Sequence, residues 1–385
     1  MIFALPSHRQ RVHVARTITA AVCAAFVTAC GEDSATAATP KPPAAILVLD
    51  GFIQPGLTSV GDTGTATTKI ALGATTEFDA GGFSFQSDTA LAVSSRAAGD
   101  VLYIVDVKSL VVKKVQMPTK SNPSRARLLK GSGGQSLIGV ALRDSNAVAL
   151  VTVSASGTSS ITRIANAGTC PTDVFQYDNA TWVVDANANC KVDYKVQGDV
   201  RLIRIPTTGT TRDTITMPTM RGSGASAIVL GDVAYISAGG DASFASFPYT
   251  LISSGVVTKV DLKNRRVLSQ KNMPTNTYGA GTKLGLDGFL YVSLYENLTT
   301  FKSRIAKLRA DDLTFVGATT TSWLTLTGTA GADVSCASGV ADALGRLHCI
   351  VNGTGSVTSL VVFNAGGTEI RRVLAGQGGV DIALR

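Results

Sequence analysis

The chain has 385 residues, of which 45% are hydrophobic and only 16% charged, with 39 glycines and a formal charge of +8. So low a charge content excludes a long coiled coil, an acidic disordered tail and a histone-like basic arm. The length is sufficient for one large domain or for two of ordinary size, with enough chain to bury a substantial core.

Residues 1–29 have the pattern of a secretory signal peptide. A basic segment without acids is followed by an apolar run from Ile18 to Ala29, which is too short to span a bilayer but suits the hydrophobic region of a signal. The run ends in Val-Thr-Ala-Cys-Gly, with the cysteine at Cys30. This ending resembles the bacterial lipobox, whose cysteine becomes lipidated and N-terminal after cleavage. An ordinary cleaved signal with a chance cysteine is the alternative.

Cleavage before Cys30 removes three arginines and no acid, so the formal charge falls from +8 to +5. Because no nucleic-acid motif accompanies this mild charge, we expect no nucleic-acid partner. Residues 30–44 contain three prolines among small residues and are expected to form a flexible tether. The sequence thus predicts a lipid-anchored envelope protein, on the periplasmic side of the outer membrane or at the cell surface, with its domain in residues 45–385.

An internal repeat predicts the architecture of this domain. The tripeptide Met-Pro-Thr begins at Met117, Met217 and Met273, so that the copies lie 100 and 56 residues apart. Each repeat unit has four short β-rich runs separated by Gly, Asn, Asp and Ser, and no segment shows a long helical period. Four-stranded units repeated radially form the blades of an all-β propeller.

The β-rich runs also predict how many blades there are. Six complete blades should start near residues 81, 126, 170, 224, 279 and 333. Unpaired β-rich segments remain at 45–50, 67–72 and 379–384. They are expected to share a seventh blade with the C-terminal strand innermost, which joins the two ends of the chain and removes a free sheet edge. Six blades, with the N-terminal strands packed on the rim, is the alternative.

A basic cluster lies between the first and second expected blades. It comprises Lys120, Arg125, Arg127 and Lys130, in a segment whose prolines and serines predict an exposed loop. A solvated loop is the favoured interpretation, and a site for a polyanion or a lipid headgroup is the alternative.

Four cysteines remain when Cys30 and the signal are set aside, and they allow three pairings. Two of them flank the first hairpin of the third expected blade, and the other two flank that of the sixth, which predicts the disulfides Cys170–Cys190 and Cys336–Cys349. A redox or metal site is the weaker alternative, because the chain has no Cys-x-x-Cys and too few histidines for a zinc set.

One segment of the third blade resembles a calcium-binding loop. Oxygen-bearing side chains stand at relative positions 1, 3, 5 and 9, as Asp185, Asn187, Asn189 and Asp193. This spacing resembles the first part of an EF-hand loop, although a cysteine replaces its glycine and a valine its bidentate glutamate. The segment is therefore a candidate calcium site, with a solvated loop rich in turn formers as the alternative, and no other cofactor is expected.

The connections between the second and third strands differ in length, and those at 185–199, 238–254 and 294–302 are long. They emerge on one face of a propeller, where insertions usually mark a binding face. The candidate binding residues there are the aromatic side chains Phe244, Phe247, Tyr249, Tyr295 and Phe301. They predict a platform for a protein or another ligand, because aromatic side chains anchor interfaces. The alternative is a loop that folds its own aromatics onto the rim.

The one histidine after the signal is His348. It aligns with Trp182, Tyr235 and Tyr291 in the second strands of other blades, which predicts that it packs in the interior. A Ser-His-Asp triad would also need this histidine, and no Gly-x-Ser-x-Gly motif precedes a helix. Catalytic groups are therefore scarce.

The run Tyr291-Val292-Ser293, together with a Val-Asp tetrad and a Val-rich outer strand, resembles the YVTN-type β-propeller repeat. The resemblance covers nearly all of residues 45–385 and implies a propeller, a fold that hosts many activities. We expect a non-enzymatic binding or scaffold module that acts through the long-loop face on a protein or another ligand.

The alternative function is a lactonase-like hydrolase or lyase that uses carboxylates, with or without calcium, in the central funnel. Its first candidate residues are Asp185, Asp193, Asp241 and Glu296. A quinone or redox propeller subunit is the third class, for which the sequence lacks the motifs.

Overall fold

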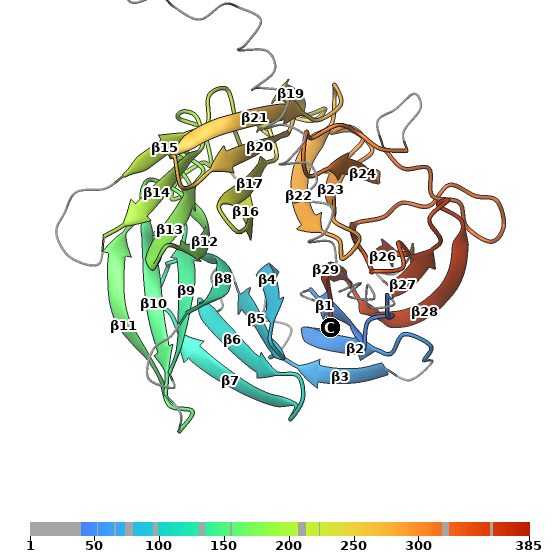
Figure 1. The fold of residues 1–385 in the computed structure, drawn as a ribbon, viewed down its shortest axis with the longest axis horizontal. Helices are drawn as coiled ribbons and strands as arrows, with labels where there is room; N and C mark the ends of the chain where they lie inside the picture. Colours follow the sequence, from blue (N-terminus) through green and yellow to red (C-terminus); the bar gives the residue numbers. More distant parts are fainter. Residues whose placement is uncertain are drawn as a thin grey trace, which may run out of the picture. The chain divides into compact units, whose positions relative to one another are not determined.

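The computed structural model describes residues 40–385 except for 52, 65–66, 74–79, 95–98, 131–134, 155, 207–212, 223, 318–322 and 355–356. Residues 42–385 form a single unit in which every named element is a strand, and the strands build seven blades around a central axis (Figure 1). The predicted signal and Cys30 lie outside the described residues. No helix in the described part of the chain is long and apolar enough to cross a membrane.

The first three complete blades are antiparallel sheets of four strands that run in order from the centre outward (Figure 1). Blade 1 consists of β4 (Ala80–Gln86), β5 (Thr89–Ser94), β6 (Val101–Asp106) and β7 (Val111–Gln116). Blade 2 consists of β8 (Pro123–Leu129), β9 (Ser136–Leu142), β10 (Ala147–Val153) and β11 (Ser159–Asn166). Blade 3 consists of β12 (Pro171–Tyr177), β13 (Ala180–Asp185), β14 (Arg201–Ile205) and β15 (Thr214–Thr216).

The next three blades follow the same plan with two departures. Blade 4 consists of β16 (Ser226–Leu230), β17 (Val233–Ala238), β20 (Val256–Asp261) and β21 (Arg266–Asn272), with an extra hairpin of β18 (Asp241–Ser243) and β19 (Thr250–Ser253). Blade 5 has three named strands, β22 (Tyr278–Leu284), β23 (Phe289–Tyr295) and β24 (Ser303–Arg309). Blade 6 consists of β25 (Ser338–Ala341), β26 (Leu347–Asn352), β27 (Val357–Phe363) and β28 (Glu369–Gln377).

Two described residues bond to the outer edge of blade 5. The Val316 N–H donates to the Lys307 carbonyl at 2.8 Å, and the Leu324 N–H donates to the Ile305 carbonyl at the same distance. Val316 and Leu324 therefore lie where the other complete blades have a fourth strand.

The seventh blade joins the two ends of the chain. Its order from the centre is β29 (Gly379–Leu384), β1 (Ile46–Asp50), β2 (Gly56–Val60) and β3 (Thr67–Ala71). β29 pairs antiparallel with β1, with Val48 opposite Ile382. Seven blades, and closure by an innermost C-terminal strand, are thus confirmed.

The Met-Pro-Thr repeat marks the junction from one blade to the next. Its three methionines are at most 3% exposed, and each donates its backbone N–H to the residue before the third strand of its blade. The pairs are Met117 to Asp100 at 2.7 Å, Met217 to Val200 at 2.9 Å and Met273 to Gly255 at 2.8 Å. The proline that follows ends the outer strand, because it has no N–H to donate.

Both predicted disulfides are confirmed. Cys170–Cys190 joins the two ends of the β12–β13 hairpin, and Cys336, just before β25, is bonded to Cys349 on β26, with Cα atoms 5.5 and 5.6 Å apart. His348 is fully buried, and its Nε2 lies 2.9 Å from the Asp342 carboxylate. This is the interior position that the aligned aromatics indicate.

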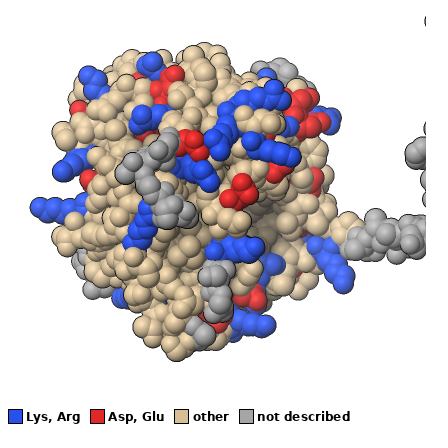
Figure 2. Space-filling view, turned by 60° about the vertical axis from the view of Figure 1, so that its left-hand side comes forward, with Lys and Arg blue, Asp and Glu red and all other residues tan. Residues whose placement is uncertain are grey.

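Charged side chains of both signs are interspersed over the side of the propeller in Figure 2, on a surface that is mostly uncharged. The view matches the small share of charged residues in the sequence, 16%.

We predict that the closing strand is essential to stability through its buried side chains. Ile382 is fully buried against Val48 and Ile350, so Ile382→Ala should lower the free energy of unfolding by about 2–4 kcal/mol. Val380, on the same strand but 44% exposed, provides the control, and Val380→Ala should cost less than about 1 kcal/mol. Denaturant unfolding measures both, and equal losses would contradict closure by β29.

Candidate functional site

The long connections of blades 4 and 5 bring the predicted aromatic side chains together. The connection from β17 to β20 carries Phe244, Phe247 and Tyr249 around the extra hairpin, while Tyr295 ends β23 and Phe301 lies in the connection to β24. Residues from two separate connections therefore meet in one place.

The rings touch in a continuous chain. Centroids are 5.6 Å apart for Phe247–Tyr249, 5.1 Å for Phe244–Tyr249, 6.0 Å for Tyr249–Phe301 and 5.5 Å for Tyr295–Phe301. A sixth ring, Tyr278 at the start of β22, lies 5.7 Å from Phe244 and was not among the sequence candidates. These six residues are called the aromatic surface below.

Much of the aromatic surface is open to solvent even though its rings pack on one another. Phe247 is 65% exposed, Phe244 50%, Tyr295 39% and Phe301 36%. Exposed apolar groups gathered in this way usually mark an interaction site. The loop thus packs its aromatics together without burying them.

The structure uses the first residue of the candidate calcium set to hold blade 3 together. Asp185 is fully buried, and its Oδ1 accepts the backbone N–H groups of Cys170 at 2.7 Å and Thr169 at 3.1 Å. Its Oδ2 forms an ion pair with Arg201, whose Nε lies 3.1 Å away. Both oxygens of this carboxylate are therefore already occupied.

The other members of the set also make contacts within the loop. Asn187 donates its side-chain amide to the Asp199 carbonyl at 3.1 Å, and Asp193 accepts the Lys195 N–H at 3.1 Å. The Asn189 carbonyl accepts three backbone N–H groups of the following turn. Among the described residues, no three His, Cys, Asp or Glu side chains are grouped to hold a metal. Calcium binding here stays a sequence-based prediction.

The carboxylates considered for a lactonase-like site are spread over three blades. Asp185 and Asp193 belong to blade 3, Asp241 lies on β18, and Glu296 follows β23 and pairs with Arg304 at 3.0 Å. None of these four lies on the innermost strand of its blade.

The inner strands place a different charged set around the central axis. Arg125 and Arg127 lie on β8, the innermost strand of blade 2, so their placement in an exposed loop was wrong. The strand begins at Pro123. A proline is tolerated at this first position, so it does not exclude a strand here. The alternation of the two arginines with the buried Ala126 and half-buried Leu128 is the sequence signal of such a strand.

Arg127 is fully engaged with the neighbouring blades. Its Nε and Nη2 lie 3.0 and 2.6 Å from the two oxygens of Asp173 on β12, and Nη2 also donates to the Ala227 carbonyl at 2.6 Å. Burial alone raises the pKa of a carboxyl, but the guanidiniums of Arg127 and Arg125 outweigh it and hold the pKa of Asp173 below its usual range. This pair links the inner strands of blades 2, 3 and 4.

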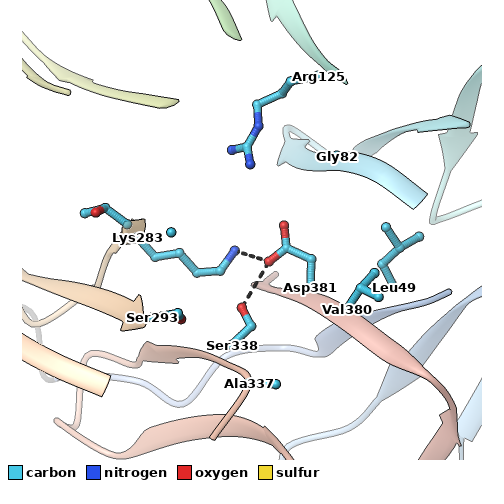
Figure 3. Close-up of a pocket in the computed structure, with 11 residues that line it drawn as sticks. Leu49, Gly82, Arg125, Lys283, Ser293, Ala337, Ser338, Val380 and Asp381 are labelled. Carbon is cyan, nitrogen blue, oxygen red and sulfur yellow. Dashed lines mark hydrogen bonds and ion pairs between the residues drawn. The ribbon is translucent and has the colours of Figure 1, made fainter. Parts of the chain in front are cut away.

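A second ion pair lies across the axis. Lys283 on β22 lies 2.5 Å from Asp381 on β29, and the Ser338 hydroxyl on β25 donates to the same carboxylate at 3.1 Å (Figure 3). Burial raises the pKa of Asp381, but Lys283 and Arg125 together lower it below its usual value.

Between these strands lies a cavity of about 250 Å³ that the sequence did not reveal. Strands of five blades contribute to its wall: β4 of blade 1, β8 of blade 2, β22 and β23 of blade 5, β25 of blade 6, and β1 and β29 of blade 7. Its lining residues are Leu49, Gly82, Arg125, Gly281, Thr282, Lys283, Ser293, Ala337, Ser338, Val380 and Asp381.

Solved structures share the fold at low sequence identity. A hypothetical selenium-binding protein from Sulfolobus tokodaii has a TM-score of 0.58 at 12% identity, over 91% of this chain and 95% of its own. A protein from Lactobacillus plantarum has a TM-score of 0.57 at 14% identity, and the match covers 89% of this chain and 99% of that protein. A "putative 6-phosphogluconolactonase" from Bacteroides fragilis has a TM-score of 0.54 at 12% identity, and the match covers 92% of this chain and 100% of that protein.

No model of a protein family matches the chain, and no curated protein matches its sequence. The likeness to solved structures shows the seven-bladed propeller fold alone. The YVTN-type resemblance stays a prediction.

We predict that Asp185 stabilises the fold. Asp185→Ala leaves buried backbone N–H groups and Arg201 without a partner, and should lower the free energy of unfolding by about 2–4 kcal/mol. Asp193→Ala, at an exposed turn of the same connection, should cost less than about 1 kcal/mol. Thermal unfolding with and without a chelator measures the difference. If a chelator abolishes it, a bound metal rather than Arg201 neutralises Asp185.

Proposed function

We propose that this protein is a non-enzymatic binding module that docks a protein partner on its aromatic surface. The observation that carries the proposal is the convergence of six aromatic side chains, with neighbouring ring centroids 5.1 to 6.0 Å apart, on the long connections of blades 4 and 5 and the strand ends beside them. The sheets beneath form a rigid frame, so the loops are held ready to bind. Aromatic anchors that become buried supply much of the binding free energy of protein interfaces.

The packing of the rings favours a protein over a sugar or a nucleobase. Interplanar angles run from 62° to 87°, so the rings meet edge to face and form a three-dimensional cluster. Flat ligands stack best on a ring whose face is open, as in single-stranded nucleic-acid binding. A cluster with ridges and gaps is better suited to apolar side chains of a partner.

The extra hairpin offers a second kind of contact beside the rings. β18 and β19 pair only with each other, so each has an edge whose backbone groups are free of ladder bonds within the described sheets. An extended segment of a partner can add to such an edge by backbone hydrogen bonds. We infer that the partner presents an extended segment with apolar side chains.

The lipobox-like ending at Cys30 supports a place in the cell envelope. A lipid on this residue, followed by the tether of residues 30–44, would hold the propeller near a membrane while leaving its loop face accessible. The partner is then an envelope or surface protein.

The structures named for 6-phosphogluconolactonase share only the fold with this chain, at 12% and 10% identity. Nothing in that likeness assigns a lactonase residue here.

Removing two rings should abolish docking. In an envelope extract, a partner captured by the wild-type chain should be lost with Phe244→Ser combined with Phe247→Ser, and retained with Ile164→Ser, which changes a residue 53% exposed on β11. With the purified partner, the double variant should raise Kd at least about tenfold, equal to about 1.4 kcal/mol. Unchanged affinity of the double variant would contradict the proposal.

The anchor has a separate test. When the full chain is expressed in bacteria, it should enter the detergent phase of a detergent–water separation, and Cys30→Ser should move it to the aqueous phase. Cys23→Ser, in the same apolar run, should have no effect. Detergent-phase partition of Cys30→Ser would exclude the lipid anchor.

A further inference from the structure

The central cavity holds one more positive than negative charge. Its charged lining residues are Arg125, Lys283 and Asp381, and the last two form an ion pair at 2.5 Å. Within the described part of the chain, no hydrogen bond or ion pair joins the Arg125 side chain to another residue, in contrast to the Arg127 side chain with its two-oxygen contact to Asp173. A partly buried cation without an ion-pair partner in contact is costly, and the lining carries a net positive charge, so the cavity attracts an anion.

The guanidinium of Arg125 extends from β8 into open space and faces the Lys283–Asp381 pair from the opposite side (Figure 3). The positive charge of Arg125 acts on carboxylates of two other blades. It helps to lower the pKa of Asp173 on β12 and that of Asp381 on β29. Among the described residues, the Lys283 ammonium contacts one partner, Asp381, so further N–H groups remain for a ligand.

An uncharged donor lines the same cavity. The Ser293 Oγ is buried and has no hydrogen-bond partner within the described residues. A buried hydroxyl without a partner costs free energy, which a ligand oxygen would recover.

The wall beside Ser293 leaves room for a ligand. Gly281 pairs with Ser293 across β22 and β23, and a Cβ added at Gly281 would meet only the Ser293 Cβ, at 3.8 Å. The volume of about 250 Å³ suits a small ligand.

We propose that this cavity binds a small organic monocarboxylate, held by the Arg125 guanidinium and assisted by Lys283 and Ser293. One negative charge makes the set of Arg125, Lys283, Asp381 and ligand neutral, whereas a phosphate dianion would leave it negative beside Asp381. Guanidinium groups match the planar carboxylate with two parallel N–H contacts. The site is separate from the aromatic surface and does not depend on it.

Calorimetric titration of the full chain with lactate, benzoate and inorganic phosphate tests the site. We expect saturable binding of at least one carboxylate, tighter than that of phosphate. Arg125→Gln should weaken this binding at least about tenfold, the loss of about one charge-assisted contact. Arg125→Lys should recover part of it. Arg266→Gln, whose side chain is 67% exposed on β21, should leave it unchanged.

A second variant separates loss of binding from loss of fold. Gly281→Leu leaves Arg125 intact and fills the space beside Ser293, so it should also abolish binding while the thermal midpoint stays near that of the wild type. The proposal is overturned if neither carboxylate binds the wild type up to about 10 mM, if phosphate binds more tightly, or if Arg125→Gln binds as the wild type does.

Discussion

The structure depends on the pairing of β29 with β1. A propeller of separate blades has two ends, and each end would expose a sheet edge and leave one blade incomplete. By placing the last strand of the chain inside the first three, the protein closes the ring and buries Ile382 against Val48. The same pairing carries Asp381 onto the innermost strand, where it meets Lys283. Closure and the charge arrangement of the cavity therefore have one origin.

Much of this fold is predictable from the sequence because each repeated residue has the same structural role in every blade where it occurs. Met117, Met217 and Met273 recur because each makes the same backbone contact and fills the same interior position at the end of a blade. The disulfides follow from symmetry about a hairpin turn. The aromatic surface is predictable in part, because the long loops of adjacent blades emerge on one face and carry five of its six residues, Tyr295 at the end of β23 included. Tyr278 was missed because it starts a strand rather than lying in a loop.

The central charges are harder to predict, for two reasons. Pro123 and the serines around it resemble a loop, although a proline that begins an inner strand breaks no hydrogen bond. The partners also lie far apart in sequence: Asp173 is one blade away from Arg127, and Asp381 is joined to Lys283 only once the ring closes. Candidates taken from local patterns alone, such as Asp185, have structural roles that only the surrounding backbone reveals.

Two surfaces with different chemistry thus share one frame: exposed edge-to-face rings on the loops, and a small polar cavity at the axis. We propose that the rings are the docking surface for a protein partner. Hydrogen–deuterium exchange of the chain with its captured partner tests it most directly. We expect residues 241–253 and 295–301 to be protected from exchange on binding, and residues 185–199 to exchange as they do in the free chain. Protection confined to 185–199, or absent from both aromatic segments, would contradict it.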